Sequence, residues 1–184
     1  MKLSKEQYTD IAAGAVALAL IVGLGTFLFL SHHNKQTDTN AALTQYQALK
    51  PCDLLTTVEA TEVLGEGSRK VQDTTPQSNG DLSIATCSYS DGAKSEAELK
   101  LASLTIRSAL NDEGIQSNKR GFDQNRTDTM LSVEGYGDAA YYDAAKGQFN
   151  ILKGRNWMIV TNGKTDPMND TLDDAKLVAD KVFN

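Results

Sequence analysis

The chain has 184 residues, with 18 lysines and arginines against 24 aspartates and glutamates, which gives a formal net charge of -6. This length suits one ordinary domain beside a short additional segment. A nucleic-acid-binding protein usually presents a basic stripe, whereas the densest basic pairs here, which begin at Arg69 and Lys119, are isolated and lack a row of aromatic neighbours. Composition and charge therefore argue against nucleic acid as a partner.

An uncharged apolar run, residues 11–30, follows a short N-terminal segment. A helix of this length reaches about 30 Å, the thickness of the hydrocarbon core of a bilayer, so the run predicts one transmembrane helix. Lys2 and Lys5 precede it and only Lys35 closely follows it, which predicts a cytoplasmic tail at residues 1–10 and a cell-membrane location with the C-terminal side extracytoplasmic. A cleaved signal peptide is the competing interpretation. Because no A-x-A-like site follows the run, we expect an uncleaved signal-anchor.

One face of this predicted helix carries small side chains spaced by three or four residues. They are Ala12, Ala15, Ala19, Gly23 and Thr26. Rows of small residues allow close packing between helices in lipid, which predicts a homodimer or a partner protein held through this face. The alternative is composition alone, since alanine and glycine are frequent in membrane helices.

Residues 31–50 are rich in Asn, Gln and Thr and predict a polar tether ahead of an extracytoplasmic domain at residues 51–184. The chain's 2 histidines, His32 and His33, lie in this tether. Two adjacent side chains point in different directions on a helix and bring no further ligands, so we predict no metal site.

The domain opens with a locally well-specified helix. Thr56 and Glu59 have the spacing of a capping box, and Gly65 suits the position after a helix end, which predicts a short helix ending at Leu64. Cys52 and Cys87 are the 2 cysteines of the chain. In an exported domain an even count predicts a disulfide, and closing this loop contributes about 3 to 4 kcal/mol. Two buried free thiols are the alternative.

Alternating or β-rich stretches between turn signals predict the strands. They are residues 82–89, 99–107, 139–142, 148–152 and 157–161. In the second stretch the apolar phase shifts between Leu101 and Leu104, which predicts a bulge or a break. The last three, joined by short turns, predict an antiparallel meander.

Two further segments predict helices. Residues 111–127 are polar and begin with helical signals, with Ile115 and Phe122 as apolar anchors. A closing helix follows Pro167, with Thr171 and Asp174 in a capping arrangement. We therefore expect an α+β fold: one N-terminal transmembrane helix, then an antiparallel sheet of about five strands packed with N- and C-terminal helices.

Three segments carry a resemblance to a known group. They are P-C-D-L-L-T-x-x-E-A-x-x-x-L-G at residues 51–65, C-S-Y at residues 87–89 and G-Y-G-D-A-A-Y at residues 135–141. The domain resembles a family of small bacterial cell-envelope proteins of unknown function, many of them actinobacterial lipoproteins. The resemblance implies an exported α+β domain whose two cysteines can pair, and it brings no catalytic residues. This chain differs in having no cysteine directly after the apolar run.

No motif indicates a chemistry, so we assign no catalytic residue and expect no cofactor. Gly163-Lys164-Thr165 lacks the earlier glycine of a phosphate loop, and the domain has no histidine for a nucleophile relay. Carboxylates at Asp112-Glu113 and Asp173-Asp174 are better explained by helix starts, and Asp138 by turn amides. Aromatic residues on the meander are the candidate partner contacts: Tyr136, Tyr141, Tyr142 and Trp157. Tyr141 and Tyr142 are adjacent in a strand and must face opposite sides.

Three functional hypotheses follow from these features. The first is a single-pass, membrane-anchored extracytoplasmic domain that is not an enzyme and binds a partner protein or an envelope ligand, including as a subunit of a membrane assembly. The second is an envelope-acting hydrolase that uses Asp and Glu carboxylates. The third is a purely structural stalk protein.

Overall fold

The computed structural model describes residues 46–93, 99–164 and 171–183. The chain divides into a unit at residues 1–41 and a compact domain at residues 42–184. The expected transmembrane helix, and the small-residue face of Ala12, Ala15, Ala19, Gly23 and Thr26, lie outside the described residues. Within the described ranges, no helix is both long enough and apolar enough to cross a membrane.

The domain combines helices at both ends with strands between them. In chain order the elements are α2 (Pro51–Leu54), α3 (Thr57–Leu64), β1 (Arg69–Asp73), β2 (Gln77–Asn79), β3 (Leu82–Ser90), β4 (Lys100–Ala109), α4 (Asp112–Asn125), β5 (Leu131–Ser132), β6 (Ala139–Asp143), β7 (Gln148–Lys153), β8 (Asn156–Lys164) and α5 (Leu172–Phe183).

The strands form one antiparallel sheet of eight strands within the described residues. Their order is β1-β3-β4-β8-β7-β6-β5, and β2 also pairs with β3, so β1 and β2 follow one another along the same edge. The predicted fold therefore needs two corrections: the described residues contain no helix that could span a membrane, and their sheet has eight strands rather than about five. The three strands it missed, β1, β2 and β5, are short and exposed along their whole length, so they carry no apolar alternation.

Strand β4 corrects a second expectation. It pairs with β3 and β8 without a register shift, so the predicted bulge or break is absent. The inward positions are Ala102, Leu104 and Ile106, all within 1% exposure, while Leu101 lies on the other face. The apparent phase shift arose because the small side chain of Ala102, rather than Leu101, occupies the core position.

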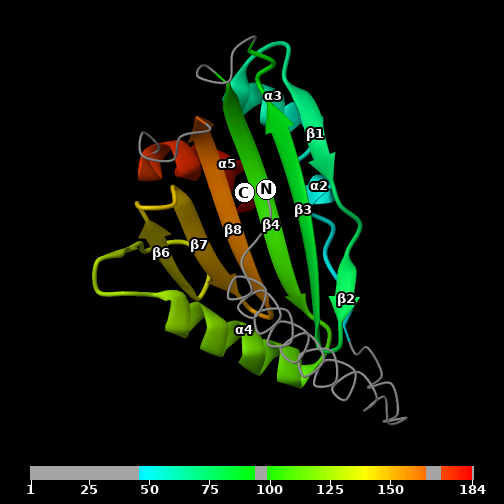
Figure 1. The fold of residues 1–184 in the computed structure, drawn as a ribbon, viewed down its shortest axis with the longest axis vertical. Helices are drawn as coiled ribbons and strands as arrows, with labels where there is room; N and C mark the ends of the chain where they lie inside the picture. The colour runs from blue at the N-terminus through cyan, green and yellow to red at the C-terminus, as the bar shows by residue number, and fades with distance from the viewer. Residues whose placement is uncertain (1–45, 94–98, 165–170, 184) are drawn as a thin grey trace, which may run out of the picture. The chain divides into compact units, whose positions relative to one another are not determined.

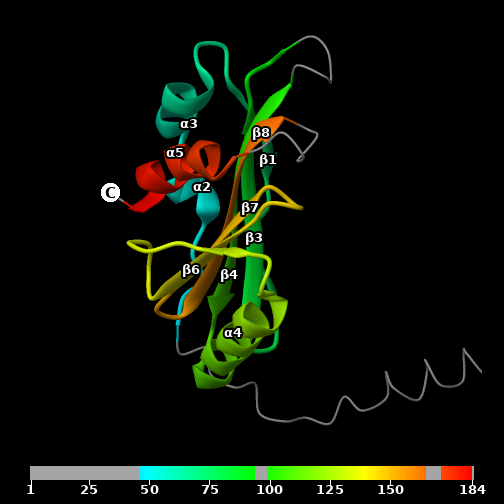
Figure 2. The same ribbon diagram turned by 90° about the vertical axis from the view of Figure 1, so that its left-hand side faces the viewer.

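Helices cover the two faces of the sheet unequally. Figure 1 looks onto one face, with α2, α3 and α5 behind the strands and α4 crossing the lower part in front. Figure 2 shows the sheet nearly edge-on, with α2, α3 and α5 together on one side. The predicted packing of N- and C-terminal helices on the sheet is thus present. We call the face toward α3 and α5 the covered face and the face toward α4 the open face.

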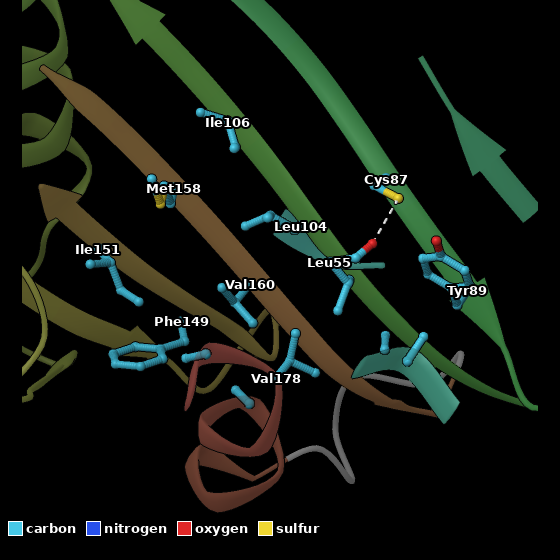
Figure 3. Packing of buried hydrophobic residues seen from close by; sticks show 14 of the residues in the cluster. Leu55, Cys87, Tyr89, Leu104, Ile106, Phe149, Ile151, Met158, Val160 and Val178 are labelled. Carbon is cyan, nitrogen blue, oxygen red and sulfur yellow. Dashed lines mark hydrogen bonds between the residues drawn. The ribbon is translucent and has the colours of Figure 1, made fainter. Parts of the chain in front are cut away.

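The covered face holds the main hydrophobic core. Figure 3 shows Leu104 of β4, Val160 of β8 and Val178 of α5 gathered in one cluster, and each is 0% exposed. Phe149 of β7 and Leu55, which follows α2, are equally buried. Burial of such side chains stabilises the fold by roughly 1.5 to 3 kcal/mol each relative to leaving them in water.

Local signals at the ends of the domain are confirmed. Cys52 and Cys87 form a disulfide that links α2 to β3. The Thr56 and Glu59 capping box is present at α3, which ends at Leu64 before Gly65. At α5, the Asp174 amide donates to Thr171 Oγ1 over 3.1 Å, as the predicted cap requires.

The segment before α2 contacts the domain. The Tyr46 amide donates to the Leu110 carbonyl over 3.0 Å, and the Arg155 guanidinium lies 4.9 Å from the Tyr46 ring centre. The Leu49 amide donates to Ser108 Oγ over 3.0 Å. The last residues of the predicted tether, 46–50, therefore lie against the ends of β4 and β8.

Candidate functional site

The open face carries a ladder of hydroxyl side chains on three neighbouring strands. The ladder consists of Thr86, Ser88, Ser103, Thr105 and Thr161. Two hydrogen bonds cross from β3 to β4: Thr86 Oγ1 to Thr105 Oγ1 over 2.9 Å and Ser88 Oγ to Ser103 Oγ over 2.8 Å. Thr161 of β8 pairs with Ser103 and so continues the ladder across the third strand.

The ladder follows from the period of two along each strand. In β4, Leu104 and Ile106 point into the core, so Ser103 and Thr105 point to the open face. Threonine also fits a pleated strand well because its side chain is branched at Cβ. The five positions carry no charge, so this part of the face offers hydrogen bonds rather than an electrostatic field.

Helix α4 covers the other end of the open face. Its Phe122 is 1% exposed and packs with its ring centre 4.8 Å from that of Tyr141 and 6.1 Å from that of Trp157. Asn118 Nδ2 donates to the Arg107 carbonyl over 2.8 Å and to the Arg155 carbonyl over 2.9 Å. Phe122 is thus the apolar anchor that the sequence indicates, and Asn118 fastens the helix to the strand ends.

The aromatic residues predicted as partner contacts are mostly internal. Tyr141 and Tyr142 face opposite sides of β6, as strand alternation requires, yet they are only 1% and 5% exposed. Trp157 is 5% exposed under α4. Tyr136 donates to Asp180 Oδ1 over 2.5 Å, and burial, with help from this hydrogen bond, raises the pKa of Tyr136 to about 12. These four residues therefore do not form one exposed aromatic patch.

A small polar cavity opens where α4 ends on the open face. We call it the Tyr141 pocket; it has a volume of about 110 Å³. Its walls come from the last residue of α4, from β6, β7 and the turn between them, and from the middle of β8. The lining residues are Asn125, Tyr141, Asp143, Lys146, Gln148, Asn150, Trp157 and Ile159. Ile159 pairs with Thr105, so the pocket adjoins the hydroxyl ladder.

Several polar groups of the pocket have no partner within the described residues. The Tyr141 hydroxyl makes no hydrogen bond there although the residue is 1% exposed. Burial raises the pKa of Tyr141, Asp143 raises it further and Arg126 opposes the shift, so the hydroxyl stays protonated at neutral pH and can donate. The side-chain amide of Gln148 is likewise unpaired, whereas Asn150 Oδ1 accepts the indole N–H of Trp157 over 3.1 Å.

The charges of the pocket are already balanced. Lys146 Nζ lies 2.8 Å from Asp143 Oδ2, and Asp143 Oδ1 accepts the Ala145 amide over 3.1 Å. Asp143 is 4% exposed, so its carboxylate is shielded from water and compensated by these two donors. The pocket therefore presents donors and acceptors without a net charge.

Other carboxylates considered in the sequence serve local structure. Asp112 accepts the Tyr46 hydroxyl over 3.1 Å, Asp174 caps α5, and Asp138 Oδ2 accepts the Gly154 amide over 2.7 Å, as predicted for a turn. In the parts of the chain that the structure describes, no three His, Cys, Asp or Glu side chains gather as a metal site requires.

The segments that carry the family resemblance act in folding. Cys52 holds the disulfide, Thr56 caps α3, and Ala60 is fully buried. A Cβ at Gly137 would lie 2.3 Å from the Leu152 carbonyl oxygen, and the φ of this glycine is +59°. These residues of the motifs therefore belong to the scaffold, whereas Ser88 of the ladder and Tyr141 of the pocket lie in the same segments and face the open side.

Comparison with protein families, with curated proteins and with solved structures finds no match for this chain. The resemblance to bacterial envelope proteins consequently stays a prediction from the motifs. Sequence reasoning named Tyr141 and Trp157 but missed Gln148, Asn150 and the ladder. The available signal was the alternation of Ser and Thr with apolar residues in β3 and β4, which is also typical of any half-exposed sheet.

Proposed function

We propose that the chain is an extracytoplasmic, non-catalytic binding domain that takes up an uncharged, hydroxyl-rich ligand of the cell envelope, a glycan, on its open face. The observation that carries the proposal is the hydroxyl ladder, which runs uncharged across β3, β4 and β8 and leads into a polar pocket. Hydroxyl groups both donate and accept hydrogen bonds, so a row of them suits a ligand that does the same.

The build of the domain supports binding on this side. The covered face is filled by α2, α3 and α5, and its side chains are committed to the core. On the open face, most residues of the hydroxyl ladder are half-buried and so retain contact with water. Ligands of this kind usually exchange water for hydrogen bonds at such partly wet surfaces.

The disulfide supports an extracytoplasmic location. The bond between Cys52 and Cys87 joins segments separated by 35 residues, and structural disulfides persist mainly in oxidising compartments. In such a compartment, the uncharged ladder favours a ligand rich in hydroxyl groups over a strongly charged one.

The test is co-sedimentation of the full-length protein with insoluble wall glycan prepared from the cells that express it. Ser103→Lys places a long cation in the middle of the ladder and should weaken sedimentation about tenfold. Leu177→Lys is the matched control, because Leu177 is 53% exposed on α5 and belongs to the other side of the molecule. Thermal unfolding of both variants checks that they fold.

Two results would overturn the proposal. The first is a wild-type protein that does not sediment with the glycan. The second is a Ser103→Lys variant that folds and sediments as well as the wild type.

A further inference from the structure

We infer that the Tyr141 pocket is the subsite that binds a single sugar ring of the ligand, with the rest of the glycan running along the hydroxyl ladder. This inference deepens the proposed function and rests on it. It adds Asn125, Gln148 and Asn150 to the Tyr141 and Trp157 that the sequence marks, and it predicts that a monosaccharide alone should bind.

The hydroxyl of Tyr141 is open to the pocket. Tyr141 is only 1% exposed as a residue, but its hydroxyl is not among the fully buried, unpaired polar atoms of the described residues, so water can reach it. Within the described residues this hydroxyl has no hydrogen-bond partner, and Tyr141 lines a cavity of about 110 Å³. Such a volume holds about three waters, and these are the molecules that a ligand would displace.

The pocket offers both hydrogen-bond donors and hydrogen-bond acceptors. Tyr141 donates through its hydroxyl, the Gln148 amide both donates and accepts, and Asn125 Oδ1 remains open because only its Nδ2 is engaged, with the Gly121 carbonyl at 2.7 Å. A ligand that meets all three must carry groups able to donate and to accept. Neighbouring hydroxyls on a sugar ring have this property.

The pocket is neutral, because the two charged side chains in its lining, Asp143 and Lys146, form an ion pair. The buried carboxylate of Asp143 would repel an anionic ligand, and a cationic ligand would compete with Lys146 for that carboxylate. An uncharged ring avoids the repulsion and the competition, and it can still accept hydrogen bonds from the remaining N–H groups of Lys146.

One wall of the pocket is apolar. Trp157 and Ile159 line the side of the pocket formed by β8. A sugar ring has C–H groups on its faces as well as hydroxyls at its edge, so it can pack against this wall while its edge bonds to the polar side. Because Ile159 pairs with Thr105, the next ring of the same glycan would lie outside the pocket, beside the hydroxyl ladder.

The experiment uses the full-length protein and the fluorescence of Trp157, the 1 tryptophan of the chain, which lines the pocket. Titration with N-acetylglucosamine should give a saturable change. Tyr141→Phe keeps the ring against Phe122 but removes the hydroxyl, and should weaken binding about fivefold, the loss expected for one hydrogen bond. Tyr136→Phe is the matched control, because its hydroxyl bonds to Asp180 of α5, and it should leave the titration unchanged.

Three outcomes would overturn the subsite. One is no saturable change with N-acetylglucosamine. Another is equal affinity in the wild type and in Tyr141→Phe. The third is a saturable change with the peptide trialanine but none with the sugar, which would assign the pocket to a peptide ligand.

The subsite and the proposed function can fail separately. If Ser103→Lys abolishes sedimentation with wall glycan while Tyr141→Phe sediments as the wild type does, the function stands and the subsite fails. If the monosaccharide binds and is weakened by Tyr141→Phe, but the protein does not sediment with the glycan, the subsite stands and the proposed function fails.

Discussion

The covered face and the open face are built from alternate residues of the same strands and have opposite properties. In β4, Leu104 is 0% exposed against α3, whereas its neighbour Thr105 is half-buried and hydrogen-bonds across to Thr86. The difference shows that this sheet separates its tasks by face: apolar packing on one side stabilises the fold, and uncharged polar groups remain available on the other. The following substitutions test that division.

The largest effect is expected for Phe149→Ala on the covered face. Phe149 is 0% exposed and stacks edge-to-face with Tyr136 at 4.9 Å between ring centres. Removing the ring leaves a cavity that rigid neighbours cannot fill, so the free energy of unfolding should fall by about 3 to 5 kcal/mol. Urea denaturation measures it. Leu131→Ala, at a residue 56% exposed, is the control and should change it by less than about 0.5 kcal/mol.

The second-largest loss of stability is expected when the disulfide is removed. Replacing both cysteines, as in Cys52→Ala with Cys87→Ala, removes a cross-link over 35 residues and should lower the free energy of unfolding by about 3 to 4 kcal/mol through the entropy of the unfolded chain. Denaturation of the wild type with and without reductant gives an independent value. A double variant as stable as the oxidised wild type would contradict the assigned role of the bond.

The motif glycines provide a matched pair of intermediate size. Gly137→Ala forces a Cβ against the Leu152 carbonyl at a φ of +59°, whereas Gly135→Ala meets open space at a φ of +88°. Both should lose about 1 kcal/mol or more to the backbone conformation, and Gly137→Ala should lose clearly more because of the clash. Thermal unfolding compares them. If both variants lose the same stability, the close approach of Gly137 to the Leu152 carbonyl does not explain why the motif has a glycine there.

The smallest effect is expected on the open face. Thr105→Val removes the hydroxyl that bonds to Thr86 Oγ1 at 2.9 Å, but keeps the shape and the strand preference of the side chain. Because water can reach Thr86, the free energy of unfolding should change by less than about 1 kcal/mol. The same variant should weaken sedimentation with wall glycan. A loss of stability as large as that of Phe149→Ala would remove the distinction between the two faces.

Local signals were sufficient for much of the fold. The capping box at Thr56, the pair of Cys52 and Cys87, and the meander of β6, β7 and β8 all appear as the sequence indicates. Each depends on residues close in sequence, on the pairing of only two cysteines, or on short turns. The weaker strands β1, β2 and β5 escaped detection because their residues are exposed and acquire strand structure only by pairing with a neighbour.

The candidate site was less accessible to sequence reasoning. The sequence indicated Tyr141 because it is an aromatic residue of the meander. Gln148, Asn150 and Asn125 look like ordinary polar residues of strands and a helix end. They converge only because α4 crosses the open face and ends beside β6 and β7. The position of α4 across the sheet cannot be predicted from residue spacing, because Asn125 and Asn150 lie far apart in sequence.

By itself, the sequence determined which side chains alternate, where α3 and α5 begin, and which cysteines pair, because periodicity, capping and covalent chemistry act over short range or through unique partners. Only the tertiary structure decided which face of the sheet stays open. That choice depends on where the helices pack: α2, α3 and α5 together bury the Leu104 side, and of the helices in the described ranges α4 covers part of the Thr105 side. Alternate residues of the same strands form the core on one side and a polar surface on the other, because burial depends on which helices pack against each face and not on the strand alone.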